Sequence, residues 1–571
     1  MPTKWKLENI YNNPQDTSQD IQILKQKIQD LLENLKNFRE NQGKEEKILS
    51  FIKEYEKIIE SYRKLQSYIT CILSTNSQNE TAQKVKSVIH NVSSSLIILN
   101  LELEKIISKL KPNIPNYEYF VQKLIENNEH RMKDDEEELY SKLFISSSSE
   151  WKSLYNELIS NIKVEFENEI ISISKLRNFY NHFDRNLRQK AYNKELQIFK
   201  EYEYIFSKIL NSVKWDSIVV SQKRKFNSLL DKSLFENDID REILDIVLNT
   251  TFENLSIVRK YFYKKASLMN LDKLEWFDIS APIYEDKSVI FDFEKAKNFI
   301  LDNFARFSNE MYELALKAFE EGWIDAEPRL GKTDGGFCIY IFSNQSRILV
   351  NYDNSIKSLL TLAHELGHAY HNYVMSENTP IYRYSPLILA ETASILAETI
   401  TRKNALKNLT DTKTKTIILD GYLYTISVVT VDIISRFLFE DKVIKIREQR
   451  ILTPSELCNI MIDSQKEVYL DSINSYHPYM WANKPHYYIS NYYNYPYLVG
   501  LLVGLSLFNL YESNKISAKD YREILKNSGK DKPERILKNF GLNIRSKNFW
   551  QEAFDLIAKD IEEFDKLPPV R

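Results

Sequence analysis

Cysteine is scarce in this chain of 571 residues, and so is any excess of charge of one sign. The three cysteines, Cys71, Cys338 and Cys458, are widely separated and form no CxxC pair. We therefore expect structural thiols in a reducing compartment and no disulfide framework. The 77 lysines and arginines almost balance the 80 acidic residues, which leaves a net charge of −3. Such a chain has no overall field to attract nucleic acid or an anionic membrane, and we expect neither as a partner.

Long apolar runs are also missing. The longest, from Tyr497 to Phe508, is well short of the roughly 20 residues that cross a bilayer. It contains Gly500 and Gly504 at the small-residue spacing of closely packed helices, so it predicts a buried helix. The first residues are charged and lack the apolar segment of a secretory signal. These features together lead us to expect a cytoplasmic protein.

Glycine and proline are almost absent from the first half of the chain. Only Gly43 precedes Gly322, and only Pro112 and Pro115 lie between Pro14 and Pro282. A stretch with so few turn-forming residues predicts long helices. Apolar residues recur at helical spacing over residues 21–35, 48–62 and 86–110, which supports this prediction.

The composition changes after about residue 271, where glycine, proline and alternating apolar residues become more frequent. The runs 337–342 and 347–352 are typical of strands, and the four residues between them suggest a hairpin loop. Helical patterns resume at Ser355. We therefore expect a mainly α protein with a small β-sheet. We divide it into an N-terminal helical lobe, residues 1–190, and a catalytic domain, residues 191–571.

The chemistry is carried by His364-Glu365-x-x-His368, which lies inside a strongly helical pattern. Residues four apart share one face of a helix, so both imidazoles can bind one zinc ion. Glu365, turned by about 100°, can reach a water on that zinc. The alternative, two histidines packed in a helical core, is the weaker interpretation because the motif sits well inside its helix.

A catalytic zinc usually takes three protein ligands, so a third must lie elsewhere. The pattern HExxHxxGxxH fails here, because His371 stands at its glycine position and Val374 at its third histidine position. Ser385-Pro386 predicts a helix start, and the next helix carries Glu391 and Glu398 on one face. We take Glu391 as the third ligand and Glu398 as a carboxylate that holds a ligand histidine through its other ring N–H. His371 is expected to face solvent or substrate rather than the metal.

Tyrosines gather near the C-terminal end of this region. Nine of the 35 tyrosines lie between Tyr469 and Tyr497, interleaved with His477 and His486. Tyrosine O–H and histidine N–H groups can stabilise an oxyanion, and aromatic faces line peptide clefts. Core packing is the ordinary role of any single tyrosine, but the run from His486 to Tyr495 favours a catalytic role.

Several of these motifs together resemble the thimet oligopeptidase and oligoendopeptidase F family of zinc metallopeptidases. The spacing of the histidine and tyrosines near the end is closer to the oligoendopeptidase F branch. The resemblance is strong over residues 320–505. It is carried by Asp334-Gly-Gly-Phe-Cys338, Ile348-Leu-Val-Asn-Tyr352, Thr361-Leu-Ala-His-Glu-Leu-Gly-His-Ala-Tyr-His371, Glu391-Thr-Ala-Ser394 with Glu398, and the run that begins at His486.

The resemblance implies a fold, a cofactor and a set of site residues. It implies a mainly helical, two-lobed body with a deep substrate channel, one zinc ion, and cleavage of short unstructured oligopeptides. By motif position it implies zinc on His364, His368 and Glu391, catalysis by Glu365, and hydrogen bonds to the substrate or transition state from His486, Tyr488 and Tyr495. We further expect the substrate backbone to pair with the 337–342 strand and to contact Gly335, Gly336, Phe337 and Cys338.

Two other functions remain open at this point. One is an exopeptidase that trims peptide ends, as a dipeptidyl carboxypeptidase does, although no acidic anchor for a substrate amine precedes the HExxH motif and no carboxylate clamp identifies itself. The other is a helical peptide-binding protein without catalysis. Every residue that the hydrolytic chemistry needs is present, so we expect a zinc endopeptidase.

Overall fold

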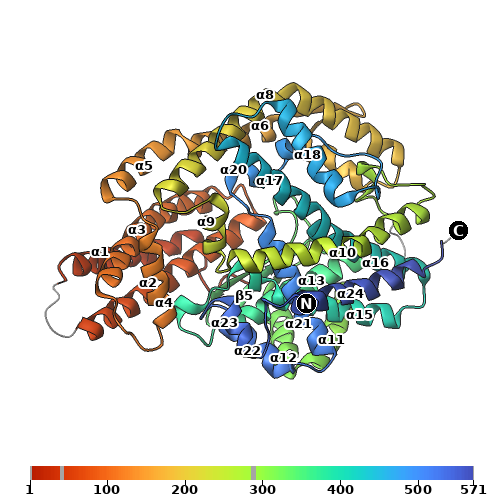
Figure 1. The fold of residues 1–571 in the computed structure, drawn as a ribbon. Coiled ribbons are helices and arrows are strands. Elements are labelled where there is room, and N and C mark those ends of the chain that lie inside the picture. The colour runs from red at the N-terminus through yellow and green to blue at the C-terminus, as the bar shows by residue number, and fades with distance from the viewer. Residues whose placement is uncertain (1–2, 39–43, 285–290, 570–571) are drawn as a thin grey trace. The chain divides into compact units, whose positions relative to one another are not determined.

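The structure is a computed structural model that describes residues 3–38, 44–284 and 291–569. Across these residues it is mainly helical with two small sheets (Figure 1), so the expected fold class is confirmed. The chain forms two compact units, the first from Met1–His130, Ile290–Ala405 and Tyr511–Gly541, the second from Arg131–Val289, Leu406–Leu510 and Leu542–Arg571. Each unit is thus built from three separate stretches. The division at residue 190 and the substrate channel stay predictions.

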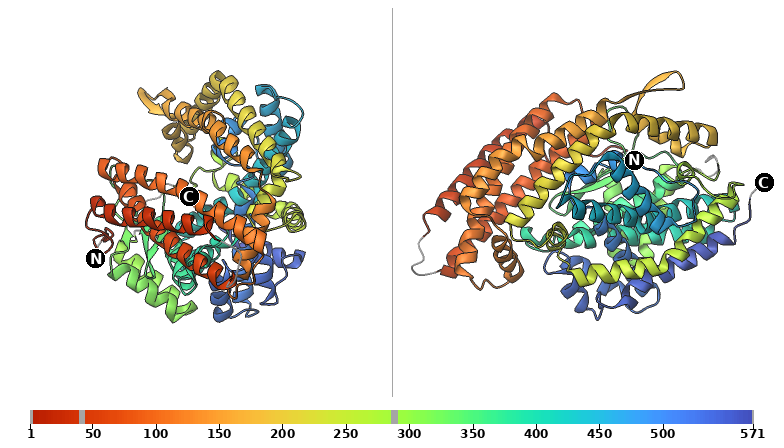
Figure 2. Two further views of the ribbon diagram at one scale, coloured as in Figure 1. Left: turned by 90° about the vertical axis from the view of Figure 1, so that its left-hand side faces the viewer. Right: turned by 45° about the horizontal axis from the view of Figure 1, so that its top comes forward.

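Long helices open the first unit. α1 (Thr17–Lys36), α2 (Lys44–Thr75) and α3 (Glu80–Leu110) lie side by side (Figures 1 and 2) and are followed by α4 (Glu118–Glu129). Their apolar stripes are buried, as Leu24, Ile28 and Ile52 illustrate. Burial of such a stripe is what stabilises helices of this length. The helices expected over 21–35, 48–62 and 86–110 are therefore confirmed.

The first unit also contains the small sheet predicted near residue 340. β5 (Gln345–Leu349) lies in the middle, pairing parallel with β3 (Ile324–Asp325) and antiparallel with β4 (Phe337–Phe342). The predicted hairpin loop is shorter than four residues, because Ser343 and Asn344 both adopt positive φ angles and close a two-residue turn. The second strand ends at Leu349 and not at residue 352 as the sequence suggested.

Helices complete the first unit around this sheet. Their bounds are α11 (Phe293–Phe307), α12 (Asn309–Glu320), α13 (Ile356–Met375), α14 (Leu387–Ala390), α15 (Thr392–Asn408), α22 (Ala518–Asn527) and α23 (Pro533–Lys538), with short 3₁₀ turns η1 (Pro14–Asp16) and η4 (Pro380–Tyr382). α13 packs against β4, β5 and α22. Ser355 begins α13 as its N-cap, with its hydroxyl accepting from Ser358 N at 3.1 Å.

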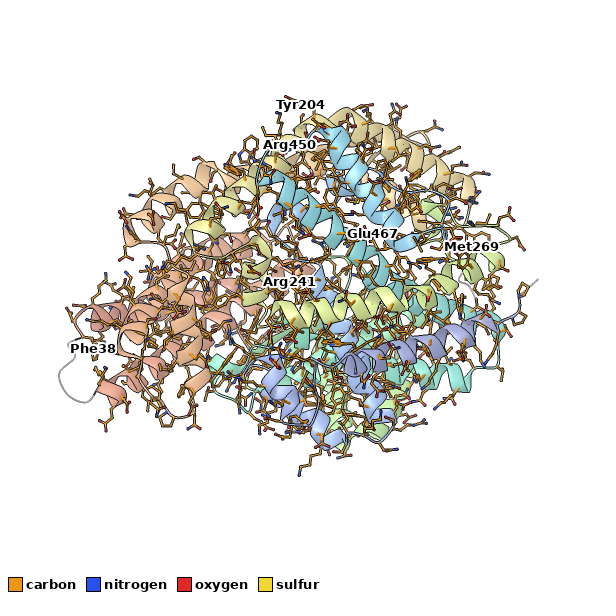
Figure 3. All side chains as sticks on the ribbon, in the orientation of Figure 1. Phe38, Tyr204, Arg241, Met269, Arg450 and Glu467 are labelled. Atoms are coloured by element: carbon orange, nitrogen blue, oxygen red, sulfur yellow. The ribbon has the colours of Figure 1, made fainter. Side chains whose placement is uncertain are left out.

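The second unit is helical apart from one hairpin, β1 (Lys163–Phe166) and β2 (Glu169–Ser172). Its helices are α5 (Asp134–Ser146), α6 (Ser148–Asn161), α7 (Ile173–Asn178), α8 (Arg185–Lys223), α9 (Leu229–Glu236), α10 (Arg241–Leu268), α16 (Thr412–Ser427), α17 (Ile433–Arg447), α18 (Pro454–Tyr469), α19 (Met480–Asn483), α20 (His486–Ile489), α21 (Tyr495–Glu512) and α24 (Lys547–Asp565), with turns η2 (Phe179–Asn181) and η3 (Trp276–Asp278). A π-helical turn, η5 (Val428–Asp432), joins α16 to α17. α8 exposes Tyr204 on its outer face (Figure 3).

Two apolar helical segments of this unit are buried. α21 contains the apolar run that the sequence assigned to a buried helix, and Leu502, Val503 and Leu505 are almost fully inaccessible to solvent. The continuous segment Thr412–Arg447 is long and apolar enough to span a membrane by composition, but 67% of its most apolar window is buried. This burial is typical of a core helix.

A glycine of the HExxH motif sets the distance between α13 and α15. A Cβ atom on Gly367 would lie 2.6 Å from the Ala393 carbonyl oxygen and 2.7 Å from Ser394 Cα. Those separations are shorter than van der Waals contact, so only glycine lets the two backbones approach this closely. The close approach places the histidine face of α13 against the start of α15.

We predict that Gly367→Ala will destabilise the protein, because its methyl group forces α13 and α15 apart. Such overpacking costs about 1–3 kcal/mol, and separation of the helices should also weaken metal binding. Thermal denaturation and zinc stoichiometry after dialysis would measure both effects. Gly421→Ala in α16 is the matched control, because no atom lies within 4 Å of its Cβ position and alanine is the better helix former. An unchanged melting temperature and full zinc content in Gly367→Ala would contradict the prediction.

Candidate active site

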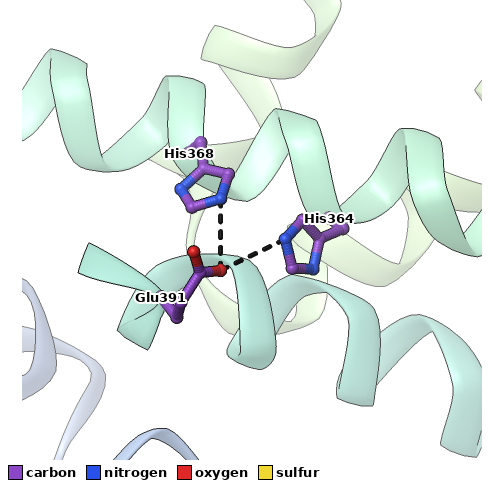
Figure 4. Close-up of side chains that lie close together, drawn as sticks. All are labelled: His364, His368 and Glu391. Carbon is purple, nitrogen blue, oxygen red and sulfur yellow. Dashed lines mark ion pairs between the residues drawn. The ribbon is translucent and has the colours of Figure 1, made fainter. Parts of the chain in front are cut away.

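Three predicted metal ligands meet in the first unit. Nε2 of His364 and Nε2 of His368, one turn apart on α13, each lie 3.3 Å from Oε2 of Glu391 (Figure 4). All three potential ligand atoms fall within 4.8 Å of one another. Two imidazoles and one carboxylate are a donor set that suits zinc and leaves a position for water. The residues therefore fit the expected metal ion.

Glu391 is held at a break between two helices. It lies between α14 and α15, and its carbonyl accepts the first hydrogen bond of α15 from Ile395 N at 2.9 Å. The sequence had placed it within one continuous helix that starts near Pro386. The hydroxyl of Ser394 donates to Glu391 Oε2 at 2.9 Å, and the position at a helix start favours a negative charge. The break thus orients the carboxylate toward α13.

Glu398 contacts the opposite side of a metal-ligand histidine. Its Oε2 lies 3.0 Å from Nδ1 of His364, which leaves Nε2 of the same ring directed at Glu391. A carboxylate that accepts from Nδ1 fixes the ring orientation and makes the other nitrogen a better ligand. The structure thus contains the contact expected between Glu398 and a ligand histidine.

Carboxylates dominate the electrostatics of this cluster. Burial lowers the pKa of His364, but its hydrogen bonds with Glu391 and Glu398 outweigh burial and raise that pKa to about 10. Burial raises the pKa of Glu391, yet the two histidines outweigh it and hold that pKa well below its usual range. Three carboxylates surround the two imidazoles. The third is Glu365, whose negative charge also raises the pKa of His364. Such an anionic cluster favours a divalent cation at its centre.

Glu365 differs from the other carboxylates in its surroundings. Its side chain is buried, and Oε2 has no hydrogen-bond partner within the described part of the chain. Burial is the main cause that raises the pKa of Glu365. A raised pKa brings a carboxylate closer to the range in which it can both accept and return a proton near neutral pH.

The segment expected to contact substrate lies beside Glu365. A Cβ atom on Gly336 would lie 3.2 Å from Glu365 Oε1, so a side chain there would crowd the carboxylate. Gly335 adopts a positive φ angle of 82°, and Phe337 and Cys338 begin β4 as half-buried residues. β4 pairs with β5 on one edge only, within the residues described. Gly335, Gly336, Phe337 and Cys338 thus stand next to the candidate base, and their substrate contact stays a prediction.

His371 faces neither the metal nor solvent or substrate, which were the surroundings considered from the sequence. It is 4% exposed, and its Nε2 lies 2.9 Å from Oγ of Ser528 in the loop after α22. Burial lowers its pKa to about 4, so the ring is neutral at pH 7. The expectation that His371 faces solvent or substrate is wrong, because one further helical turn carries it past the metal centre and into the contact with α22.

The tyrosine-rich run belongs to the second unit and divides into buried and half-buried side chains. Tyr487, Tyr488 and Tyr495 are at most 1% exposed. The Tyr488 ring stacks on Tyr155 at a centroid distance of 3.9 Å, and the Tyr495 hydroxyl accepts from Ser233 Oγ at 3.3 Å. These contacts are those of core side chains, so the burial argues against direct substrate contact by Tyr488 and Tyr495.

Two other tyrosines of the run accompany His486. Tyr493 and Tyr497 are half-buried, their hydroxyls are hydrogen-bonded to each other, and the His486 ring stacks on Tyr493 at 5.0 Å. Burial, with Arg436 and Lys484 nearby, lowers the pKa of His486 to about 4. Neither Tyr493 nor Tyr497 stands out individually in the sequence of this run. The spacing of four between them, which puts both on one side of a turn entering α21, was the available signal.

Comparison with known proteins gives consistent results. A model described as Peptidase family M3 matches residues 179–556, and one described as Oligopeptidase F matches residues 98–163. Oligopeptidase PepF of Bacillus subtilis is 24% identical, with 99% of this chain and 87% of that protein covered. An oligoendopeptidase F homolog of Borreliella burgdorferi is also 24% identical, with 99% and 98% covered.

Solved structures share the fold. A crystal structure from Chlamydophila abortus superposes with a TM-score of 0.83 at 22% identity, covering 99% of this chain and 98% of that one. Oligoendopeptidase-F from Enterococcus faecium superposes with a TM-score of 0.70 at 17% identity, covering 97% and 99%.

The helical fold, the HExxH helix and the downstream glutamate define a metallopeptidase of the HExxH type. Because the matching model spans more than half of the chain, the protein belongs to peptidase family M3, and the resemblance found from the sequence is confirmed.

We predict that Glu398→Gln will weaken zinc binding about 10- to 100-fold, because His364 loses the negative charge that its Nδ1–H faces. Competition with a chromogenic chelator would measure the affinity. Glu320→Gln, which alters an exposed carboxylate of α12 outside the centre, should bind zinc like the parent protein. Equal affinities in the two variants would show that Glu398 does not support the metal site.

Proposed function

We propose that the protein is a zinc-dependent endopeptidase that hydrolyses internal bonds of short unstructured oligopeptides in the cytoplasm. The observation that carries this proposal is the meeting of His364, His368 and Glu391 beside a buried, unpartnered Glu365 oxygen. A structural metal site would need no unpartnered carboxylate next to it. The names of the M3 relatives support peptides as the substrate class.

Each residue has a distinct task in the proposed reaction. His364, His368 and Glu391 would hold zinc, which when bound polarises water and the scissile carbonyl. Glu365 accepts the proton of the attacking water and returns it to the leaving amine. Glu398 fixes the orientation of His364 through Nδ1. Burial of Glu365 serves this cycle, because its raised pKa makes the carboxylate a stronger base toward the attacking water.

The substrate backbone is proposed to pair with β4. This strand has an edge that pairs with no other described strand, and Gly336 brings its start against Glu365. An extended peptide added to such an edge gains main-chain hydrogen bonds regardless of its sequence. Only a flexible chain can adopt this conformation, which is why we propose unstructured peptides rather than folded proteins.

We predict that Glu365→Gln will lower peptide cleavage by a factor of about 10² to 10⁴ or more, because the shape is kept and the base is lost. Digestion of a mixed peptide library, analysed by mass spectrometry with and without a zinc chelator, would test this. The library should include peptides capped at both ends, since an exopeptidase spares them and an endopeptidase cuts them. Near-normal cleavage by Glu365→Gln with zinc retained, or by the chelated parent protein, would overturn the proposal.

The oxyanion donors need a revised assignment. From the resemblance we expected His486, Tyr488 and Tyr495, but of these only His486 keeps a half-exposed side chain. We propose that Tyr493 and Tyr497 act with His486, because both side chains are half-buried and the Tyr493 ring stacks on His486. A donor of this kind strengthens its hydrogen bond as charge develops on the substrate oxygen.

We predict that Tyr493→Phe will lower turnover about 10²- to 10³-fold with little change in stability or zinc content. Tyr488→Phe is the matched control, because it removes a buried hydroxyl that has no partner within the described residues. Its turnover should stay near that of the parent protein. The reverse pattern, with turnover lost only in Tyr488→Phe, would restore the original assignment and exclude ours.

A further inference from the structure

A cavity lies in the first unit at the C-terminal end of the metal-ligand helix. Its volume is about 770 Å³, which is within the range of small-ligand sites. Its lining includes Lys53 of α2, Tyr117 and Glu118 before and in α4, Asn378 and Tyr382 after α13, and Lys530 between α22 and α23. We call it the α13-end pocket. It shares no residue with the metal centre, and at 1.5 Å per residue the end of α13 lies about 10 Å beyond His368.

The positive charges of the α13-end pocket are only partly paired. Lys526 forms an ion pair with Glu377 at 2.6 Å, and a second pair joins an arginine and an aspartate at the rim. Lys53 and Lys530, by contrast, have no ion pair within the described part of the chain. Burial and the neighbouring Lys526 lower the pKa of Lys530. An anionic ligand group between these two lysines would compensate the cost of burying the Lys530 charge.

The pocket also presents acceptors without donors. Asn378 is 5% exposed, and its Nδ2 donates to the Lys526 carbonyl at 2.6 Å while its Oδ1 has no partner among the described residues. A buried amide oxygen without a partner is destabilising, so a ligand N–H there is favoured. Among the described residues, Glu118 accepts a hydrogen bond from the backbone N–H of Asn116 alone, at 3.1 Å, and keeps capacity for a cation.

The backbone that carries Lys530 is fixed by a close contact. A Cβ atom on Gly529 would lie 2.6 Å from the Tyr382 carbonyl oxygen and would also clash with the carbonyl of Tyr384. The loop after α22 is thus pressed against the segment after α13. Tyr117 and Tyr382 stack across the same region with centroids 6.2 Å apart. The pocket is therefore formed by packed elements, and its polar groups have defined positions.

We propose that the α13-end pocket binds a short zwitterionic peptide, separately from the metal centre. Lys53 and Lys530 receive its C-terminal carboxylate, Asn378 Oδ1 accepts from its amide N–H, Glu118 faces its ammonium group, and the tyrosines contact an apolar side chain. A free anion would satisfy the lysines but leave Asn378 unpaired, whereas a dipeptide or tripeptide satisfies every group. This ligand class follows from the pocket itself and does not depend on the proposed peptidase activity.

Titration calorimetry and lysine footprinting of the whole protein would test this with the dipeptide Gly-Tyr, checked by mass spectrometry to remain intact. We expect Gly-Tyr to bind and to protect Lys530 from acetylation, with Lys538 of α23 as the exposed reference lysine in the same chain. Gly-Tyr amide, which lacks the carboxylate, should bind at least about tenfold more weakly. Lys530→Gln should bind Gly-Tyr more weakly than the parent protein and should distinguish the two peptides less, because only Lys53 then faces the carboxylate. Lys538→Gln should bind like the parent protein.

Other results would overturn the inference. Binding that is unaffected by Lys530→Gln and leaves Lys530 unprotected would place the peptide elsewhere, including the metal centre. Protection of Lys530 by acetate or inorganic phosphate at the same concentration as by Gly-Tyr would show an anion site without peptide recognition. Absence of binding to a folded parent protein would exclude the site. Loss of peptide cleavage in Glu365→Gln, which tests the proposed function, should leave Gly-Tyr binding unchanged.

Discussion

The candidate metal centre depends on one close contact between two helices. His364 and His368 reach Glu391 only because Gly367, on the turn between them, lets α13 rest directly on the backbone at the start of α15. A side chain at that position would separate the two helices by more than the ligand geometry tolerates. The spacing of the HExxH motif therefore specifies one face of a helix, while the glycine inside it specifies how near the partner helix can come.

Charge is the second constraint on this centre. Glu391, Glu398 and Glu365 lie around the same pair of imidazoles, and taking several carboxylates out of water is costly unless cations compensate. A hydrogen bond from Ser394 and ion-pair contacts with both histidines compensate Glu391, and His364 compensates Glu398. Glu365 receives no such bond within the described residues. Glu391 and Glu398 are thus held in place by polar contacts, whereas Glu365 remains available to accept a proton.

Much of the fold and of this centre could be predicted from the sequence, because both rest on local patterns. Helices follow from apolar spacing and from the absence of glycine and proline, and the HExxH pair is fixed by helix periodicity. The β1–β2 hairpin was missed because its turn, Glu167-Asn168, adopts positive φ angles without a glycine to mark it. Glu391 was found, but the helix break beside it was not, since Leu387 to Asn408 reads as one helical pattern.

Features that depend on tertiary packing could not be predicted from the sequence, and they share one reason. The run from His486 to Tyr497 has nearly uniform composition, so nothing local separates Tyr488, stacked on Tyr155, from the half-buried Tyr493. His371 likewise follows His368 at a helical spacing of three residues, yet its surroundings come from Ser528, more than 150 residues away in the chain.

The division of the chain into two units, each built from three stretches, has the same origin. Residue type and spacing fix which groups can do chemistry, whereas the partners that bury or expose each group come from distant parts of the chain. A motif-based assignment is therefore most reliable for residues held on one helix and least reliable within a run of similar aromatic side chains.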